Sequence, residues 1–186
     1  MNTRTIPLVA ICIAIVTTFV STARVPIAAT GGFTHPGAIA EIFVALAFGP
    51  IVGMIAAGVG AAIADLISGY ASFAPLTLVA HGLLGFLAGW LGWKKGQVAM
   101  FTGWIVGGLA LVAVYFIGEA TVYGMGDVAG AEVPINLLQV GLGIVGIGLF
   151  VWMKRSYPQI EQLAGDVSFT EEPTAEDVTF TEEPTS

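Results

Sequence analysis

The chain has 186 residues, of which 56% are hydrophobic and 10% are charged, and its formal net charge is −7. Ordinary globular domains carry about a quarter charged residues, so this composition excludes a soluble monomeric protein. Most of the negative charge lies at the end of the chain, because eight of the thirteen acids follow Ser156 and residues 1–155 carry six basic and five acidic groups. We therefore expect a membrane domain at 1–155 and an acidic, disordered cytoplasmic tail at 156–186.

Six apolar runs follow one another along the first part. They cover residues 6–22, 37–48, 50–68, 75–93, 98–123 and 133–153. A helix needs about 20 mainly apolar residues to cross a bilayer, and continuous runs favour helices over strands, which would have to close into a barrel. The sequence thus predicts an all-α, polytopic membrane protein with six transmembrane helices. The second run is short and is joined to the third by Gly49 and Pro50, so we expect that it does not span fully.

The basic residues predict the orientation, because they favour cytoplasmic loops. With the amino terminus inside, five of the six basic residues are cytoplasmic and only Arg24 is outside. Both termini are then cytoplasmic, and the protein is a multi-pass cell-membrane protein. An alternative reading makes residues 1–23 a cleaved signal peptide, since small residues follow the first apolar run. The single cysteine, Cys12, excludes an internal disulfide.

The tail contains a near-exact repeat. Residues 166–174 read DVSFTEEPT and residues 177–185 read DVTFTEEPT. Two acidic, proline-containing nonamers are too few to stack into a solenoid, and such a composition stays solvated. We interpret the repeat as part of the disordered tail, with docking to a basic partner surface as the alternative.

Polar side chains within the apolar runs gather in the halves predicted to face outside. Such groups are costly in a membrane and mark function by default. They are Thr77 and His81 in the fourth run, Tyr115, Glu119 and Tyr123 in the fifth, and Asn136 and Gln139 in the sixth. The cytoplasmic halves hold no comparable group between the basic ends, so the pattern predicts a substrate pocket open to the exterior rather than a pore. Glu41 and Asp65 also lie in outer halves, and we interpret Asp65 as structural.

Two predicted outer loops, at 24–36 and 68–74, could cover such a pocket, and we call them the lid loops. The first holds Phe33 and His35, and the second holds Tyr70 and Phe73. Aromatic side chains on loops can stack on a planar ligand; the alternative is an interfacial aromatic belt.

Small residues recur every four positions in two runs. The third run holds Ala56, Gly60 and Ala64, a spacing that lets helices pack closely. The first run holds Ala10 and Ala14 in its cytoplasmic half, which on spacing alone is a common pattern.

Residues 31–91 resemble the S components of energy-coupling factor (ECF) transporters, in particular the riboflavin-type branch. The matching features are a short second helix, the hinge L-x-x-G-P-x-x-G from Leu46 to Gly53, a Gly/Ala-rich third helix that ends near Asp65, a Gly-Tyr loop and a fourth helix that starts at Pro75. Gly37 is followed by Ala38, where many riboflavin-type members have an acid. No residue set matches a specific riboflavin, thiamine or biotin site.

The resemblance implies a six-helix subunit that binds a vitamin at its outer side, with helices four to six beneath the lid loops. It implies that Ala10 and Ala14 contact an energy-coupling transmembrane subunit, which two ABC ATPases drive. It implies no cofactor and no nucleic-acid partner.

Two other classes of function remain as alternatives. One is a small intramembrane enzyme that uses His81 and Glu119; the rhomboid-like serine pattern and H-E-x-x-H are both absent from the sequence. The other is a membrane scaffold. We expect no catalytic residue and no metal site. Walker A is missing, so ATP would have to be used by another subunit.

Overall fold

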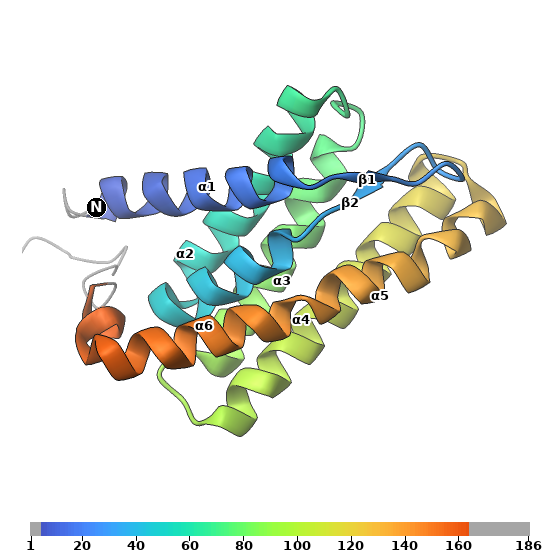
Figure 1. Cartoon of the computed structure of the whole chain (residues 1–186). Helices are drawn as coiled ribbons and strands as arrows, with labels where there is room; N and C mark the ends of the chain where they lie inside the picture. Colours follow the sequence, from blue (N-terminus) through green and yellow to red (C-terminus); the bar gives the residue numbers. More distant parts are fainter. Residues whose placement is uncertain (1–4, 164–186) are drawn as a thin grey trace, which may run out of the picture.

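The computed structural model describes residues 5–163, and it is a bundle of helices with one short β-hairpin (Figure 1). The helices are α1 (Thr5–Thr22), α2 (Gly37–Ser68), α3 (Ala74–Gly92), α4 (Gln97–Ile117), α5 (Val133–Gly141) and α6 (Gly143–Ser156). Three short helical turns complete them: the π-turn η1 (Gly118–Val122) and the 3-10 turns η2 (Gly126–Ala131) and η3 (Pro158–Gln162). The hairpin pairs β1 (Val25–Pro26) with β2 (Phe33–Thr34).

In the part of the chain that the structure describes, four stretches are long and apolar enough to cross a membrane: Gly37–Ser68, Ala74–Gly92, Gln97–Val122 and Gly126–Ser156. Ile6–Thr22 is a shorter apolar helix. The prediction of an all-α membrane protein is therefore confirmed. The count differs from six because α2 covers two of the predicted helices.

Helix α2 is sharply bent at Gly49, whose φ of 87° and ψ of 179° are not helical. A Cβ placed on Gly53 would lie 2.9 Å from the Cα of Ala45, whereas residues eight apart in a straight helix are separated by about 12 Å. The two halves of α2 therefore fold back on each other (Figure 1). The break falls where the sequence predicts it, because glycine tolerates positive φ and Pro50 can only begin a helix, not continue one.

Small residues allow the helices to approach one another closely. A Cβ on Gly58 of α2 would lie 2.7 Å from the carbonyl oxygen of Leu78 in α3. Between α1 and α2, the Thr17 hydroxyl donates a 2.9 Å hydrogen bond to the carbonyl oxygen of Gly60. The predicted packing role of the small residues in the third run is confirmed, since Ala56, Gly60 and Ala64 are all buried.

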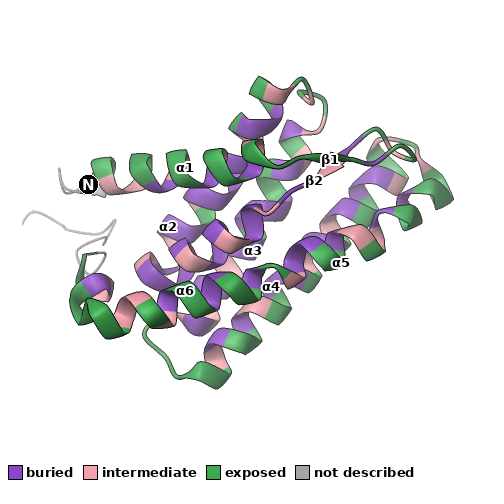
Figure 2. Ribbon diagram, viewed as in Figure 1, coloured by how far each residue is buried: buried purple, intermediate pink, exposed green. Residues whose placement is uncertain are grey.

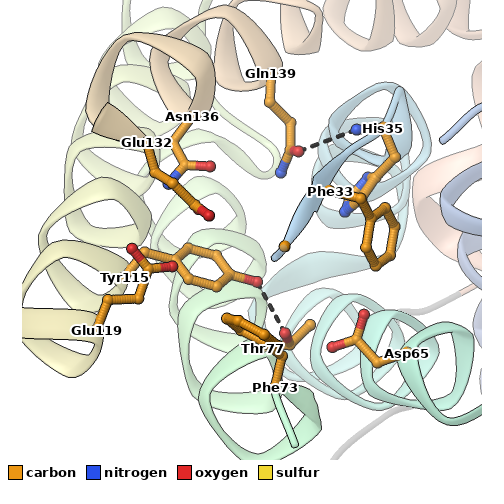
Figure 3. Close-up of a pocket in the computed structure, with 11 residues that line it drawn as sticks. Phe33, His35, Asp65, Phe73, Thr77, Tyr115, Glu119, Glu132, Asn136 and Gln139 are labelled. Carbon is orange, nitrogen blue, oxygen red and sulfur yellow. Dashed lines mark hydrogen bonds between the residues drawn. The ribbon is translucent and has the colours of Figure 1, made fainter. Parts of the chain in front are cut away.

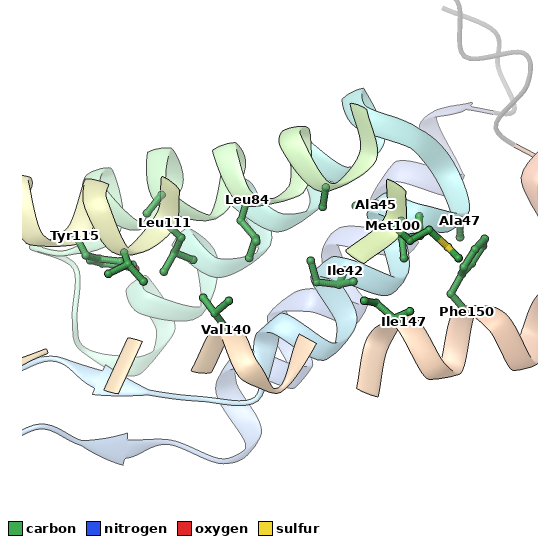
Figure 4. Packing of buried hydrophobic residues seen from close by; sticks show 14 of the residues in the cluster. Ile42, Ala45, Ala47, Leu84, Met100, Leu111, Tyr115, Val140, Ile147 and Phe150 are labelled. Atoms are coloured by element: carbon green, nitrogen blue, oxygen red, sulfur yellow. The ribbon is translucent and has the colours of Figure 1, made fainter. Parts of the chain in front are cut away.

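The apolar core runs along the interior of the bundle (Figure 4), and the outer faces of the helices are exposed (Figure 2). Its largest members come from α2, α3, α4 and α6: Ile42, Leu84, Leu111 and Phe150. The core fixes these four helices relative to one another, and so it fixes the polar side chains that they carry near one end.

The two ends of the bundle differ. The start of α1 and the end of α6 lie at one end, and the hairpin and the connection between η1 and α5 lie at the opposite end (Figure 1). The sequence predicted no strands; two-residue strands are too short to show an alternating pattern, and these lie within the first lid loop. Beyond α6, Ile160 of η3 packs into the core. The acidic repeat lies outside the described residues.

Candidate functional site

A narrow, polar cavity lies at the hairpin end of the bundle, with about 350 Å³ of atom-free space when the solvent at its mouth is counted. The cavity is lined by the first lid loop, by the end of α2 and the start of α3, and by α4, η1 and α5. The lining residues are Gly32, Phe33, His35, Asp65, Phe73, Thr77, Tyr115, Glu119, Glu132, Asn136 and Gln139.

Five of the seven residues predicted for the pocket line this cavity. They come from three segments distant in the sequence: Thr77 from α3, Tyr115 and Glu119 from α4 and η1, and Asn136 and Gln139 from α5. All five are buried, and the Tyr115 hydroxyl donates a 2.9 Å hydrogen bond to the Thr77 hydroxyl oxygen (Figure 3).

Glu119 sits in the π-turn η1, which directly follows α4. A π-turn places one extra residue in the helix and is frequent at functional sites. The Glu119 side chain is 0% exposed, points into the cavity, and neither carboxylate oxygen has a hydrogen-bond partner among residues 5–163. A buried carboxylate without partners is costly, so this side chain is the one most in need of a ligand.

The other two predicted residues do not line the cavity. Tyr123 follows the π-turn, which breaks the four-residue spacing, and its hydroxyl donates a hydrogen bond to the carbonyl oxygen of Ser72 at the rim. His81 lies beneath the cavity, and its ring centroid is 5.3 Å from that of His35 and 5.9 Å from that of Tyr115. Tyr123 thus contacts a lid loop, and His81 supports two lining residues.

The lid loops lie against the cavity. Phe33, His35 and Phe73 line it, whereas Tyr70 packs on Phe33 with 4.5 Å between ring centroids. Phe73 stacks on Tyr123 at 5.4 Å. These aromatic pairs join the first lid loop to the second, and the second to the end of η1.

Hydrogen bonds also hold the first lid loop to α5. The Gln139 side-chain oxygen accepts from the Thr34 hydroxyl at 3.0 Å and from the His35 backbone N–H at 3.2 Å. The Thr30 hydroxyl contacts the Glu132 carboxylate. A ligand of vitamin size therefore requires this loop to move, because its contacts close the cavity.

His35 is held neutral in the closed loop. Its Nδ1 accepts a 3.1 Å hydrogen bond from the Gly37 backbone N–H. Burial, and secondarily the neighbouring His81, lowers the pKa of His35 well below 6.5. The imidazole therefore supplies no positive charge to the cavity at neutral pH.

Two carboxylates of the cavity were not predicted as site residues. Asp65, which the sequence analysis interprets as structural, lines the cavity, and its Oδ2 lacks a hydrogen-bond partner within the described part of the chain. Glu132 precedes the sixth apolar run and attracts no notice there. Its spacing to Asn136 and Gln139, four and then three residues, is that of one helix face and could have identified it.

The arrangement suits non-covalent binding of a small planar molecule. Phe33, Phe73 and Tyr115 offer ring faces for stacking, and the carboxylate and amide side chains offer acceptors. No group of three or more His, Cys, Asp or Glu residues that could hold a metal occurs in residues 5–163.

Comparison with known proteins identifies the family of the chain. The family described as "ECF-type riboflavin transporter, S component" matches residues 1–155. A relative from Pyrococcus woesei, described as "Uncharacterized protein in gap 3'region", is 38% identical over 144 residues, which are 74% of this chain and 94% of the relative. The chain therefore belongs to the S components of ECF-type riboflavin transporters, which are membrane-embedded, substrate-binding subunits for vitamin uptake and not enzymes.

Proposed function

We propose that this S component captures riboflavin or a similar planar micronutrient in the cavity at its extracellular end. It then delivers the solute with an energy-coupling transmembrane subunit and two ABC ATPase subunits. The observation that supports this most is the convergence of Thr77, Glu119 and Asn136, from three separate segments, on one cavity beneath the aromatic lid loops. Family membership favours a binding subunit over the enzyme and scaffold alternatives.

The proposed sidedness has six crossings and both termini in the cytoplasm. Counting the two halves of α2 separately, residues 5–163 contain six apolar helical segments. Lys94 and Lys95 lie between α3 and α4, and Lys154 and Arg155 lie at the end of α6. Basic residues favour the cytoplasmic side, so the cavity, at the opposite end from α6's basic terminus, is extracellular.

The proposed contact with the energy-coupling subunit lies on α1. Ala10 and Ala14 are exposed on this helix, and Ile11 and Ile15 beside them are exposed as well. Small side chains flanked by apolar ones let another helix approach closely in a membrane. This face is therefore free to receive a partner helix.

Purification of the full chain in mild detergent, followed by mass spectrometry of copurifying small molecules and titration with riboflavin, tests the proposal. We expect a bound micronutrient, or saturable riboflavin binding, that is lost in Glu119→Ala. The Glu161→Ala variant serves as control, because Glu161 lies at the far end and pairs with Lys154. Absence of both a copurifying micronutrient and riboflavin binding would overturn the proposal.

A further inference from the structure

The cavity contains three carboxylates and no lysine or arginine. Asp65, Glu119 and Glu132 line it, and all three are buried. Glu119 and Glu132 both point toward the centre (Figure 3), and two carboxyl groups this close to each other favour sharing one proton, which a cationic ligand can replace. In the described part of the chain, the contacts between a basic and an acidic side chain are His81 with Glu41 and Lys154 with Glu161. None of the three cavity carboxylates is therefore neutralised by a basic side chain there.

Hydrogen bonds within the protein leave most of these acceptors unused. Glu132 has one contact, from the Thr30 hydroxyl. Both oxygens of Glu119 and Oδ2 of Asp65 have no partner among residues 5–163. The Thr77 hydroxyl oxygen already accepts from Tyr115. The cavity thus presents unsatisfied acceptors, and hydrogen-bond donors from the protein do not meet them.

The histidine at the wall does not offset this charge. His35 accepts a hydrogen bond at Nδ1 from the Gly37 N–H, an arrangement that excludes a proton on that atom. Its burial lowers its pKa. Within residues 5–163 no lysine or arginine lines the cavity, so a ligand is the natural source of a compensating positive charge.

The aromatic lining supplies the second half of the recognition. Phe33, Phe73 and Tyr115 line the same cavity as the three acids. Ring faces attract cations as well as planar rings, and carboxylates are the strongest acceptors for charged N–H donors. Aromatic faces combined with free carboxylates match a flat ring that bears a positive charge or several N–H groups.

We propose that the cavity selects a cationic, amine- or amidine-bearing planar ring over a neutral ring of the same size, with Glu119 as the main acceptor and Glu132 and Asp65 as secondary ones. This inference rests on the proposed function and narrows its substrate class: of the planar micronutrients proposed there, it favours those with a positive charge or several N–H groups over the neutral riboflavin ring. Desolvated acidic groups discriminate by charge because an uncharged ligand leaves them unpaired.

Two tricyclic probes of similar size test this inference. Proflavine is a cation at neutral pH with two amino groups, and lumiflavin is neutral. Each is titrated against the purified full chain in nanodiscs of zwitterionic lipid. We expect wild-type protein to bind proflavine about tenfold or more tightly than lumiflavin, the scale of a desolvated charge pair, and Glu119→Gln to remove most of that preference. Glu161→Gln is the matched control and should keep it.

The outcomes separate the two proposals. The charge inference is overturned if the two probes bind with equal affinity, or if the preference for proflavine survives in both Glu119→Gln and Glu132→Gln. In either case, binding of lumiflavin or riboflavin still upholds the capture function. Failure of riboflavin and of both probes to bind overturns both. If Glu119→Gln does not fold, the preference for proflavine over lumiflavin is measured in Asp65→Asn instead.

Discussion

Nδ1 of His81 lies 2.8 Å from Oε1 of Glu41, and both side chains are 0% exposed. The pair joins α3 to the first half of α2 directly beneath the cavity. Because the His81 ring also packs near His35 and Tyr115, this pair forms the floor on which two lining residues rest. The sequence suggested His81 as a ligand contact, whereas its position makes it a support for the site.

Breaking this pair should destabilise the protein. Removal of one partner leaves the other buried and unpaired, which costs about 3–5 kcal/mol, whereas removal of both is often much less harmful. We therefore expect Glu41→Leu and His81→Leu each to lower the unfolding temperature of the detergent-solubilised protein, and the double variant to lose less than the sum. Strictly additive losses would show that the two side chains do not stabilise each other.

Two cavity substitutions should weaken micronutrient binding without unfolding the protein. Glu119→Gln keeps the shape of a side chain that makes no hydrogen bond within residues 5–163, and Asn136→Ala removes one amide from α5. Loss of one hydrogen bond to a charged group costs about 1.5–3 kcal/mol, so affinity should fall at least about tenfold. Fluorescence or calorimetric titration measures this. Gln97→Ala, at the exposed start of α4, should bind as the wild type does.

Bulkier residues on the exposed face of α1 should block transport and spare binding. Ala10→Leu and Ala14→Leu add volume where a partner helix is proposed to approach, and both positions are far from the cavity lining. We expect uptake of labelled riboflavin by cells that express the complete transporter to be lost, with unchanged binding by the purified subunit. Ala113→Leu on α4, an equally exposed alanine, is the control. Normal uptake in both α1 variants would reject this face as the coupling surface.

The bend in α2 should depend on a glycine at position 49. Its φ of 87° is unfavourable for any residue with a side chain, and a Cβ there would lie 3.0 Å from the Trp93 ring. Such backbone strain costs about 1–3 kcal/mol. Gly49→Ala should therefore lower the unfolding temperature. Gly96→Ala is the control and should leave the unfolding temperature unchanged, because φ there is −74° and nothing lies within 4 Å. Equal effects of Gly49→Ala and Gly96→Ala on the unfolding temperature would contradict the requirement for glycine at position 49.

The first lid loop should open more readily as pH falls below 6.5. In the closed loop, burial and His81 hold the pKa of His35 well below its ordinary value of 6.5. Above about pH 6.5, His35 is neutral in both the open and the closed form of the loop. Below this pH, His35 takes up a proton only in the open form. The equilibrium constant for closing the loop therefore falls about tenfold between pH 7.5 and 5.5.

Thiol labelling measures this opening. Ile27→Cys, in a Cys12→Ala background, places a thiol within the first lid loop at a position that is buried when the loop is closed. We expect faster labelling at pH 5.5 than at 7.5 after correction for thiolate content. His35→Asn keeps an acceptor near the Gly37 N–H and cannot titrate, so its labelling should lose the pH dependence. A pH dependence that persists in His35→Asn would assign the effect to another group.

Sequence reasoning placed most of the polar cavity residues, and its errors have local causes. It grouped Tyr115, Glu119 and Tyr123 by a regular four-residue spacing, and the π-turn at Gly118–Val122 moved Tyr123 to the rim. It passed over Glu132 because that residue precedes an apolar run. Asp65 was interpreted as structural from its place near a helix end, yet the bend of α2 and the packing of α3 bring it to the cavity wall.

The sequence by itself determined the membrane class, the break at Gly49 and the concentration of polar groups at one end, because hydrophobicity, backbone freedom and charge act locally along the chain. Only the tertiary structure decided which polar groups share a cavity and which are paired. The partner of His81, the closure of the hairpin onto Gln139 and the unpaired state of Glu119 depend on contacts between residues distant in sequence. Such contacts follow from how helices pack, which no single segment specifies.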